Sequence, residues 1–337
     1  MRAVSNPPNP FELQYRELLE PASPARLELY EDAAKEILSR NESPDLPFRW
    51  SLNPYRGCFH GCAYCYARPT HEYWGFGSGT DFESKIIMKR DAPALLRKAF
   101  EKPSWRGELI VFSGNTDCYQ PVEASLELTR ACLEVCAEYR NPVGIITKGI
   151  LVLRDLELLK RLQQEVWVRV YFSIPFADDE VARLVEPHAP SSGRRFDAMA
   201  RLSQAGIPTG ISISPLIPGL NDEDIPELLE RAAQAGAGES MATLLRLSGP
   251  VEDVFLERMA QAFPDRLAKI THRIREVRRG ALTDSAFFSR HQGSGPYWTM
   301  IEQLYDVARK KAGFRILEEE AVPCTFRQPH AEQATLF

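Results

Sequence analysis

Three cysteines fall within eight residues of the sequence, at Cys58, Cys62 and Cys65. Their C-x3-C-x2-C spacing lets each thiolate bind a different iron of one [4Fe-4S] cube, while the fourth iron has no local cysteine. Such an open iron is a place where a substrate or cofactor can bind. Gly57 and Gly61 supply the backbone freedom with which a short loop can turn its sulfurs inward.

Two other interpretations of this cysteine group stay open at this point. A structural zinc site would take His60 as its fourth ligand, although zinc sites usually pair their ligands across a longer span than this crowded loop offers. The thiols would otherwise be buried and unligated, but packing alone seldom gathers three of them so closely.

The remaining four cysteines are scattered along the chain. Cys132 and Cys136 stand four residues apart on a predicted helix, where two metal ligands would also fit, and their apolar neighbours favour core packing. Cys324 has no partner nearby in sequence. The odd total of seven, the lack of an apolar signal segment after Met1 and the lack of a membrane-spanning apolar run predict a cytoplasmic protein with reduced cysteines.

The composition is that of an ordinary globular protein, with 44% hydrophobic and 26% charged residues among 337. These values exclude a fibrous or wholly disordered chain. The net charge of -5 argues against a surface coated with positive potential for indiscriminate binding to nucleic acid or membranes. We therefore expect no membrane partner, and any contact with DNA must be local.

Short apolar runs alternate with longer amphipathic stretches after residue 47, which is the rhythm of repeated βα units. The apolar runs predict strands at residues 49–54, 109–113, 143–147, 167–174, 209–216 and 242–247. The amphipathic stretches predict helices at residues 92–100, 123–139, 154–164, 194–204, 222–235, 251–279 and 297–311. These units indicate an α/β fold whose parallel sheet closes into an incomplete barrel.

The same pattern divides the chain into four segments. We expect an N-terminal extension over residues 1–47, with helical pieces between residues 16 and 40, and a barrel over residues 48–280. A helical appendage over residues 281–322 and a flexible tail over residues 323–337 would follow.

Polar residues stand where four of the predicted strands end. They are Ser113, Asn115, Thr116, Lys148, Ser173 and Ser214. Because the carboxyl ends of parallel strands gather at one edge of a sheet, these side chains are candidates for one site. The alternative for any one of them is an ordinary turn residue.

The cysteine motif, with Tyr64 directly before Cys65, resembles the signature of the radical S-adenosylmethionine (SAM) superfamily. Its flanks, residues 51–57 and 66–72, are similar to a bacterial branch related to spore photoproduct lyase, most of whose members have no assigned reaction. The similarity continues through residues 115–121, 146–148, 172–174 and 186–195. It implies a partial (β/α)6 barrel of the TIM type, with the cluster loop after the first strand.

The resemblance also implies cofactors and a chemistry. In that superfamily SAM binds the open iron of a [4Fe-4S] cluster, and reduction by a donor such as a flavodoxin or ferredoxin cleaves it to a 5′-deoxyadenosyl radical. Tyr64 would then lie beside the adenine, and Lys148 would pair with the methionyl carboxylate unless it is an ordinary solvated lysine. The resemblance assigns the amino group of SAM to Ser113, Asn115 and Thr116, and its ribose or adenine to Ser173 and Ser214.

One departure from the family concerns the hydrogen donor. Spore photoproduct lyase carries a cysteine at the second strand that returns a hydrogen atom to the repaired base, whereas this sequence has Gly114 there and Cys118 four residues later. Either Cys118 takes the donor role from a shifted position, or the reaction needs no such donor and Cys118 is a small packing residue. The resemblance therefore does not by itself imply thymine-dimer repair.

Two features point towards DNA. Residues 265–279 hold six basic and two acidic side chains, a local charge of +4, which would either grip phosphates or form a solvated helix face. Gln333, Leu336 and Phe337 resemble the peptide with which bacterial replication and repair proteins dock on the DNA polymerase sliding clamp. The alternative is that Leu336 and Phe337 fold back onto the body of the protein.

The sequence therefore predicts a radical SAM enzyme, with lyase or related radical chemistry, that acts on DNA in a repair-related reaction. A radical SAM enzyme acting on a peptide or a small metabolite is the first alternative. A non-catalytic iron-sulfur or zinc binding module is the second.

Overall fold

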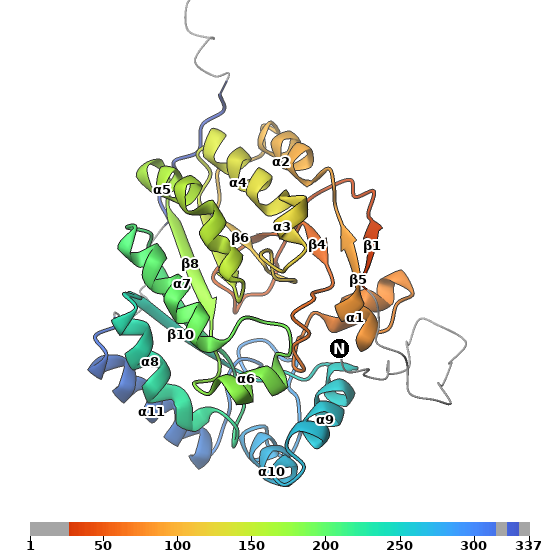
Figure 1. Ribbon diagram of the computed structural model, residues 1–337, viewed down its shortest axis with the longest axis vertical. Helices are drawn as coiled ribbons and strands as arrows, with labels where there is room; N and C mark the ends of the chain where they lie inside the picture. The colour runs from red at the N-terminus through yellow and green to blue at the C-terminus, as the bar shows by residue number, and fades with distance from the viewer. Residues whose placement is uncertain (1–26, 315–321, 330–337) are drawn as a thin grey trace, which may run out of the picture.

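The structure is a computed structural model that describes residues 27–314 and 322–329. A sheet forms its centre, with the strand order β10-β9-β8-β7-β6-β3-β2. The strands are β2 Leu38–Arg40, β3 Trp50–Leu52, β6 Ile110–Phe112, β7 Val143–Thr147, β8 Val168–Ser173, β9 Thr209–Leu216 and β10 Glu239–Leu244. Neighbours from β3 to β10 are parallel, and β2 pairs antiparallel with β3. This order confirms the predicted partial (β/α)6 barrel (Figure 1).

Helices cover the outside of this sheet (Figure 1). They are α1 Thr80–Ser84, α2 Ala92–Phe100, α3 Glu123–Leu126, α4 Leu128–Glu138, α5 Leu156–Glu165, α6 Asp179–Val185, α7 Ser192–Gln204, α8 Ile225–Gln234, α9 Val251–Ala262, α10 Leu267–Val277 and α11 Pro296–Lys311. Short 3-10 helices are η1 Arg68–Trp74, η2 Ile150–Asp155 and η3 Asp222–Asp224. Within the described ranges, no helix has the length and apolar character needed to span a bilayer.

Two of the predicted helices are each divided in the structure. The stretch 123–139 breaks at Glu127, whose φ of 52° is left-handed, so that α3 and α4 are separate. The stretch 251–279 breaks after Ala262. Pro264 accounts for the second break, because proline has no backbone N–H and its ring clashes with the preceding turn of a helix.

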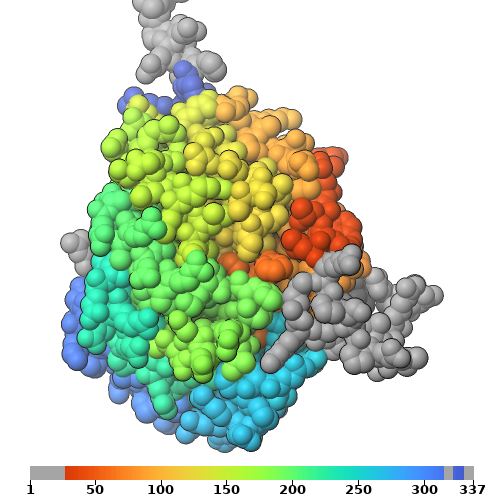
Figure 2. Space-filling model, viewed as in Figure 1, coloured from red at the N-terminus to blue at the C-terminus, as the bar shows by residue number. Residues whose placement is uncertain are grey.

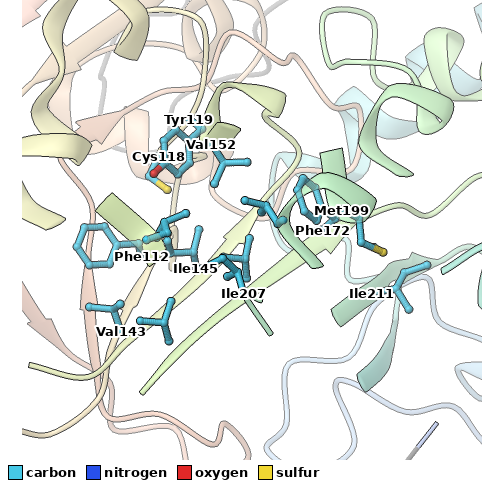
Figure 3. Close-up of a cluster of buried hydrophobic side chains, with 14 of the residues drawn as sticks. Phe112, Cys118, Tyr119, Val143, Ile145, Val152, Phe172, Met199, Ile207 and Ile211 are labelled. Carbon is cyan, nitrogen blue, oxygen red and sulfur yellow. The ribbon is translucent and has the colours of Figure 1, made fainter. Parts of the chain in front are cut away.

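The core lies between the sheet and the helices around it. Figure 3 shows Phe112 of β6, Ile145 of β7 and Phe172 of β8 among the side chains of this core, and each is 0% exposed. Strands of a parallel sheet are covered on both faces, so their sequences are nearly continuous apolar runs. That continuity is what allowed the strands to be found from the sequence.

A small second sheet, in the order β1-β5-β4, accompanies the barrel. Its strands are β1 Glu28–Glu31, β4 Tyr55–Arg56 and β5 Lys85–Met88. The helical pieces predicted between residues 16 and 40 are therefore wrong in the described part, where the chain forms β1 and β2. Both strands gain backbone hydrogen bonds from a partner elsewhere in the chain, and the local spacing of apolar residues does not reveal that gain.

Asp45, in the loop between β2 and β3, contacts the segment that follows α10. Its carboxylate accepts two hydrogen bonds from the guanidinium of Arg290, at 2.5 and 2.8 Å, and one from the backbone N–H of Phe288 at 3.1 Å. The N–H of Leu244, at the end of β10, donates to the carbonyl of His291 in the same segment. The strands at the two ends of the sheet order, β2 and β10, are thus linked through this segment.

The described C-terminal residues, 322–329, pack against the barrel. The ring of Phe326 contacts those of Phe100 and Tyr139, with centroid separations of 5.7 and 6.2 Å. The backbone N–H of Arg327 also donates to the carbonyl of Tyr139 at 2.9 Å. These residues thus contact the helix α2 and the C-terminal end of α4, and the flexibility predicted from residue 323 onwards stays a prediction.

Candidate active site

The cluster loop, which we define as residues 57–65, follows β4 and carries three cysteines. Cys58 and Cys62 are each 7% exposed, and Cys65 is partly exposed. Two turns shape the loop, since the N–H of Gly61 donates to the carbonyl of Cys58 and that of Cys65 to the carbonyl of Cys62, both at 3.3 Å. The loop therefore holds its thiols within a compact stretch of backbone.

Gly57 is required by space as well as by conformation. Its φ of 77° is left-handed, and an added Cβ would lie 2.8 Å from His71 Cε1 and 2.9 Å from the carbonyl oxygen of Phe82. The N–H of Cys58 donates to the same Phe82 carbonyl at 2.9 Å. The start of the cluster loop is thus packed tightly against η1 and α1.

Burial raises the pKa of each thiol in the loop, and that of Cys62 reaches about 12. After burial, the nearby charges of Asp117, Cys62 and Cys65 raise the pKa of Cys58 further. A thiol must lose its proton to bind iron, so assembly of a cluster here would release protons.

Three closely spaced thiols without a fourth ligand fit a [4Fe-4S] cluster that leaves one iron open. In residues 27–314 and 322–329, no three Cys, His, Asp or Glu side chains converge on a site for a single metal ion. His60, the fourth ligand in the zinc alternative, directs Nδ1 towards Asp117 Oδ2, 3.4 Å away. The contact with Asp117 thus occupies one of the two ring nitrogens with which His60 could bind zinc.

Two buried arginines hold the carbonyl groups of the loop from behind. Arg68 donates to the carbonyl of Cys62 through Nε at 3.1 Å and Nη2 at 2.7 Å, and Arg258 of α9 donates to the carbonyl of Gly61. Both arginines form ion pairs with Glu83 Oε1. We call Arg68, Glu83 and Arg258 the arginine bracket.

The helix that carries Arg258 lies beside α6. In Figure 2, the blue surface of α9 and α10 lies next to the green surface of α6, which packs on α9.

Gln120 supports the loop through a different pair of backbone groups. Its Oε1 accepts the N–H of Phe59 at 3.0 Å, and its Nε2 donates to the carbonyl of Gly57 at 3.0 Å. The side chain is fully buried, so both of its polar ends are used on the loop. Gln120 therefore helps to fix the loop backbone.

Asp117 connects the loop to the end of β7. Its carboxylate accepts hydrogen bonds from the hydroxyl of Thr147 and from the N–H of Lys148, both at 2.6 Å. Burial alone would raise the pKa of Asp117, but the charge and hydrogen bond of His60, with these two donors, hold it well below its usual range. Asp117 is thus an ionised carboxylate that positions the backbone of the Lys148 turn.

Lys148 lies among polar groups from three elements. Its Nζ donates to Ser173 Oγ at 2.8 Å, stands 3.8 Å from Glu186 Oε1 and lies 5.6 Å from the centre of the Tyr64 ring. The Tyr64 hydroxyl donates to the same Glu186 carboxylate, which also pairs with Arg195. The predicted residues Tyr64, Lys148 and Ser173 are therefore brought together beside the cluster loop.

Glu186 is a buried carboxylate that contacts Tyr64 and Lys148. Burial alone would raise its pKa, but the charges of Arg195 and Lys148 and the hydroxyl of Tyr64 hold it below its usual range. A cavity of about 320 Å³ opens beside it, lined by Arg195 and by residues of α6 and the start of α7. The Lys148 amine beside this carboxylate is a group with which an anionic part of a cofactor could pair.

Ser214 joins the same group through backbone and hydroxyl contacts. Ser173 Oγ donates to the carbonyl of Ser214 at 3.2 Å, and Ser212 Oγ bonds to Ser214 Oγ at 3.0 Å. The ends of β7, β8 and β9 therefore form one continuous polar edge, as the sequence predicted.

In the turn after β6, two of the three predicted side chains form hydrogen bonds with backbone groups of the protein itself. Ser113 Oγ accepts the N–H of Cys118 at 2.8 Å, and the Thr116 hydroxyl donates to the carbonyl of Tyr55 at 2.8 Å. The side chain of Asn115 makes no hydrogen bond with any residue that the structure describes, while its N–H donates to Asn53 Oδ1 at 2.9 Å. The ligand contact expected of Asn115 stays a prediction.

Cys118 lies in the hydrophobic core, next to Tyr119 and Val152 in Figure 3, and has no exposed surface. Burial raises the pKa of its thiol well above the usual value. This position suits a packing residue, and the donor role stays a prediction.

The family model of the radical SAM superfamily matches residues 52–232 of the chain, more than half of its length. The chain belongs to the radical SAM superfamily. Membership carries with it a [4Fe-4S] cluster and SAM as cofactors, and radical SAM enzymes in general need a reductant. The three thiols of the cluster loop, with their missing fourth ligand, agree with that requirement.

Three comparisons describe where this radical SAM protein stands within the superfamily. An uncharacterized protein of Mycobacterium tuberculosis is 38% identical over 70% of this chain and 69% of its own length. A radical SAM Nalpha-GlyT isomerase of Pseudomonas phage M6 is 26% identical over 75% of this chain and 49% of its own. A spore photoproduct lyase variant with bound AdoMet and dinucleoside spore photoproduct superposes with a TM-score of 0.61 at 15% identity, covering 85% of this chain and 79% of the lyase. The last likeness concerns the fold.

Sequence reasoning missed the parts of this radical SAM site that lie far from the cysteines. Glu83, Glu186 and Arg258 were not recognised as groups that contact the loop or its neighbours, because their contacts with Tyr64, Gly61 and one another join residues 122 to 197 positions apart. A buried carboxylate between two arginines has no spacing signature in the sequence. Only Arg68, three residues after Cys65, stood near enough to suggest a role.

The basic segment 265–279 is partly internal. Arg278 is 6% exposed and donates to the carbonyls of Leu245 at 2.8 Å and Arg290 at 2.7 Å. Arg266 donates to the carbonyl of Gly219 at 3.2 Å. The local charge of +4 therefore overstates what this segment offers to a phosphate backbone.

Proposed function

We propose that this protein cleaves SAM reductively to a 5′-deoxyadenosyl radical and uses the radical on DNA, in a repair-related or base-altering reaction. The observation that carries the first part is the grouping of Lys148, Ser173 and Tyr64 beside the three thiols of the cluster loop. In this proposal, the Lys148 amine pairs with the carboxylate of SAM while SAM binds the open iron. Lys148, Ser173 and Ser214 then orient the cofactor along the polar edge of the barrel.

Three considerations support DNA as the substrate. The spore photoproduct lyase variant has a fold similar to that of this chain over 85% of the chain, and it was solved with a bound dinucleoside spore photoproduct. Gln333, Leu336 and Phe337, which lie outside the described residues, resemble a sliding-clamp peptide. The exposed arginines of residues 265–279, among them Arg275 and Arg279, supply a local positive charge for phosphates.

The surroundings of Gly114 favour a reaction that needs no thiol from the protein. A Cβ at this position would lie 2.7 Å from Ser51 Cβ, so a cysteine would not fit there without displacing Ser51. Cys118, the other candidate, is buried in the core. A rearrangement in which the substrate takes back its own hydrogen from 5′-deoxyadenosine balances without such a donor, and one relative is named an isomerase.

Anaerobic reconstitution with iron and sulfide, followed by measurement of 5′-deoxyadenosine with and without damaged DNA, tests the proposal. We expect 5′-deoxyadenosine in the presence of dithionite, and stimulation of SAM cleavage by DNA that is detected both as 5′-deoxyadenosine and as transfer of deuterium from labelled DNA into the 5′-deoxyadenosyl group. A variant with Cys58, Cys62 and Cys65 changed to Ala is the control for iron bound elsewhere. Stimulation by peptides or small metabolites and not by DNA would overturn the substrate assignment, and a single bound zinc without iron would overturn the enzyme.

The hydrogen donor is tested with a Cys118→Ala variant. If the core position of Cys118 reflects packing, this variant keeps its turnover per cluster although it is less stable. Loss of turnover with a fully loaded cluster would instead assign Cys118 as the donor.

The clamp interaction is tested separately by pull-down with purified sliding clamp. We expect binding that is lost when the chain is truncated after Ala331. Failure of the full-length protein to bind would remove this argument for DNA and leave the radical chemistry untouched.

A further inference from the structure

The arginine bracket is a buried group of charged side chains that contacts the cluster loop. Arg68 is 0% exposed and, besides the Cys62 carbonyl, donates to the carbonyls of Ser78 at 3.0 Å and Gly79 at 2.9 Å. Its contacts therefore reach the loop and the turn before α1 at once. Arg258 is 7% exposed and reaches the loop from α9, 197 residues away in sequence from Gly61.

The bracket brings a net positive charge to the back of the loop. Arg68 and Arg258 are two cations, and Glu83 is the one carboxylate that both of them contact. Arginine stays protonated even when buried. A loaded cluster with three thiolates is negative, and reduction adds another electron to it. A fixed positive charge close by stabilises the reduced state more than the oxidised one, which raises the reduction potential.

The two arginines differ in what their removal would change. Arg68 holds two backbone segments together, the cluster loop and the turn before α1, so its loss would disturb the local fold as well as the charge. Among the described residues, Arg258 bonds to the Gly61 carbonyl and to Glu83, while its helix also packs through Val251, Phe255 and Met259 in a core that includes Cys62 and Tyr64. Arg258 is therefore the member whose charge can be changed with least damage to the loop.

We propose that Arg258 is a positioning residue of the cluster loop whose charge raises the reduction potential of the cluster. It acts through the Gly61 carbonyl and through Glu83 rather than by touching an iron or SAM. The inference goes beyond the proposed substrate, since it concerns how readily the cluster accepts an electron from its reductant. It holds whether the substrate is DNA or another molecule.

The test is a redox titration of the reconstituted protein followed by electron paramagnetic resonance, without SAM or substrate. For Arg258→Met, we expect the reduced-to-oxidised ratio at a fixed potential to fall at least tenfold, which for one electron is a shift of 59 mV to more negative potential. Arg258→Lys keeps the charge, so its reduction potential should stay close to that of the unchanged protein. Arg273→Met on α10, which removes an arginine paired with Glu276 far along the chain from the loop, is the control and should not shift the potential.

Glu83→Gln distinguishes charge from loosened structure. The amide keeps an oxygen that can accept from both arginines but removes the negative charge, so the potential should move in the opposite direction, to more positive values. If Arg258→Met and Glu83→Gln shift the potential in the same direction, or if neither shifts it, the proposal is wrong. Should Arg258→Met fail to load four irons, the sign of the Glu83→Gln shift still decides, and neither measurement depends on activity towards DNA.

Discussion

Gly57 makes a sharp test of how tightly the cluster loop is built. We predict that Gly57→Ala destabilises the apoprotein and lowers its capacity to bind iron. The new methyl group would stand at a φ of 77°, only 2.8 Å from His71 Cε1 and 2.9 Å from the Phe82 carbonyl oxygen. The Phe82 carbonyl is backbone and already accepts the N–H of Cys58, so it cannot move without moving a ligand.

The expected cost has two parts. A left-handed conformation costs a residue with a side chain about 1–2 kcal/mol relative to glycine. Forcing a methyl group into packed surroundings costs typically about 1–3 kcal/mol more. The free energy of unfolding should therefore fall by about 2–5 kcal/mol for Gly57→Ala.

Gly206→Ala separates the two parts, because Gly206 has a similar φ of 84° but no heavy atom within 4 Å of an added Cβ. This control should lose only the conformational part, about 1–2 kcal/mol, and bind its full complement of iron. Urea unfolding of the apoproteins under reducing conditions and iron determination after reconstitution supply both measurements. If Gly57→Ala loses no more stability than Gly206→Ala and binds as much iron, the close packing of the loop is not what holds it.

Three further predictions concern single side chains. Cys62→Ser should leave the protein folded but reduce bound iron from four per chain towards none, as measured by iron analysis; full loading would mean that Cys62 is not a ligand. Lys148→Met should weaken SAM binding to the loaded protein by roughly 10–100-fold, as expected for a lost charge-assisted hydrogen bond, with iron content unchanged in the same sample; unchanged SAM affinity would remove Lys148 from the cofactor site. Burial lowers the pKa of His71 to about 4, below its unfolded value of 6.5, so the neutral ring favours the fold and its contribution is complete above pH 6.5 and lost as the pH falls towards 4. Between pH 7.5 and pH 5 the loss should be about 2 kcal/mol at 1.36 kcal/mol per pKa unit, and it should be absent in His71→Gln; an equal acid loss in that variant would assign it to other groups.

The barrel strands could be predicted from the sequence where an apolar run ends in turn residues. β7 at Val143–Thr147 and β9 at Thr209–Leu216 have the predicted bounds, as does α2 at Ala92–Phe100. β10 was predicted at residues 242–247 and spans Glu239–Leu244, because its apolar run continues beyond the sheet. Leu245 and Leu247 in that continuation pack in a separate core with α9, and an apolar pattern cannot say which neighbour a side chain will meet.

The candidate site likewise has a part that could be predicted from the sequence and a part that could not. Cys58, Cys62 and Cys65 could be found because their spacing is a local property of eight residues. The contacts of Tyr64 with Glu186 and of Gly61 with Arg258 join positions 122 and 197 residues apart, so no local pattern encodes them. They follow from the closing of the barrel, which brings α6 and α9 to the edge where the cluster loop lies.

The reach of Arg258 to Gly61 also sets an order of events during synthesis. At about 5–20 residues per second, the 197 residues between them take about 10–40 s to make. For most of that time the nascent chain already carries its three thiols but lacks Arg258, the member of the arginine bracket that contacts the Gly61 carbonyl. A ribosome-bound chain ending before Val251 lacks the contact of Arg258 with the Gly61 carbonyl, and we expect it to hold iron less firmly than the finished protein.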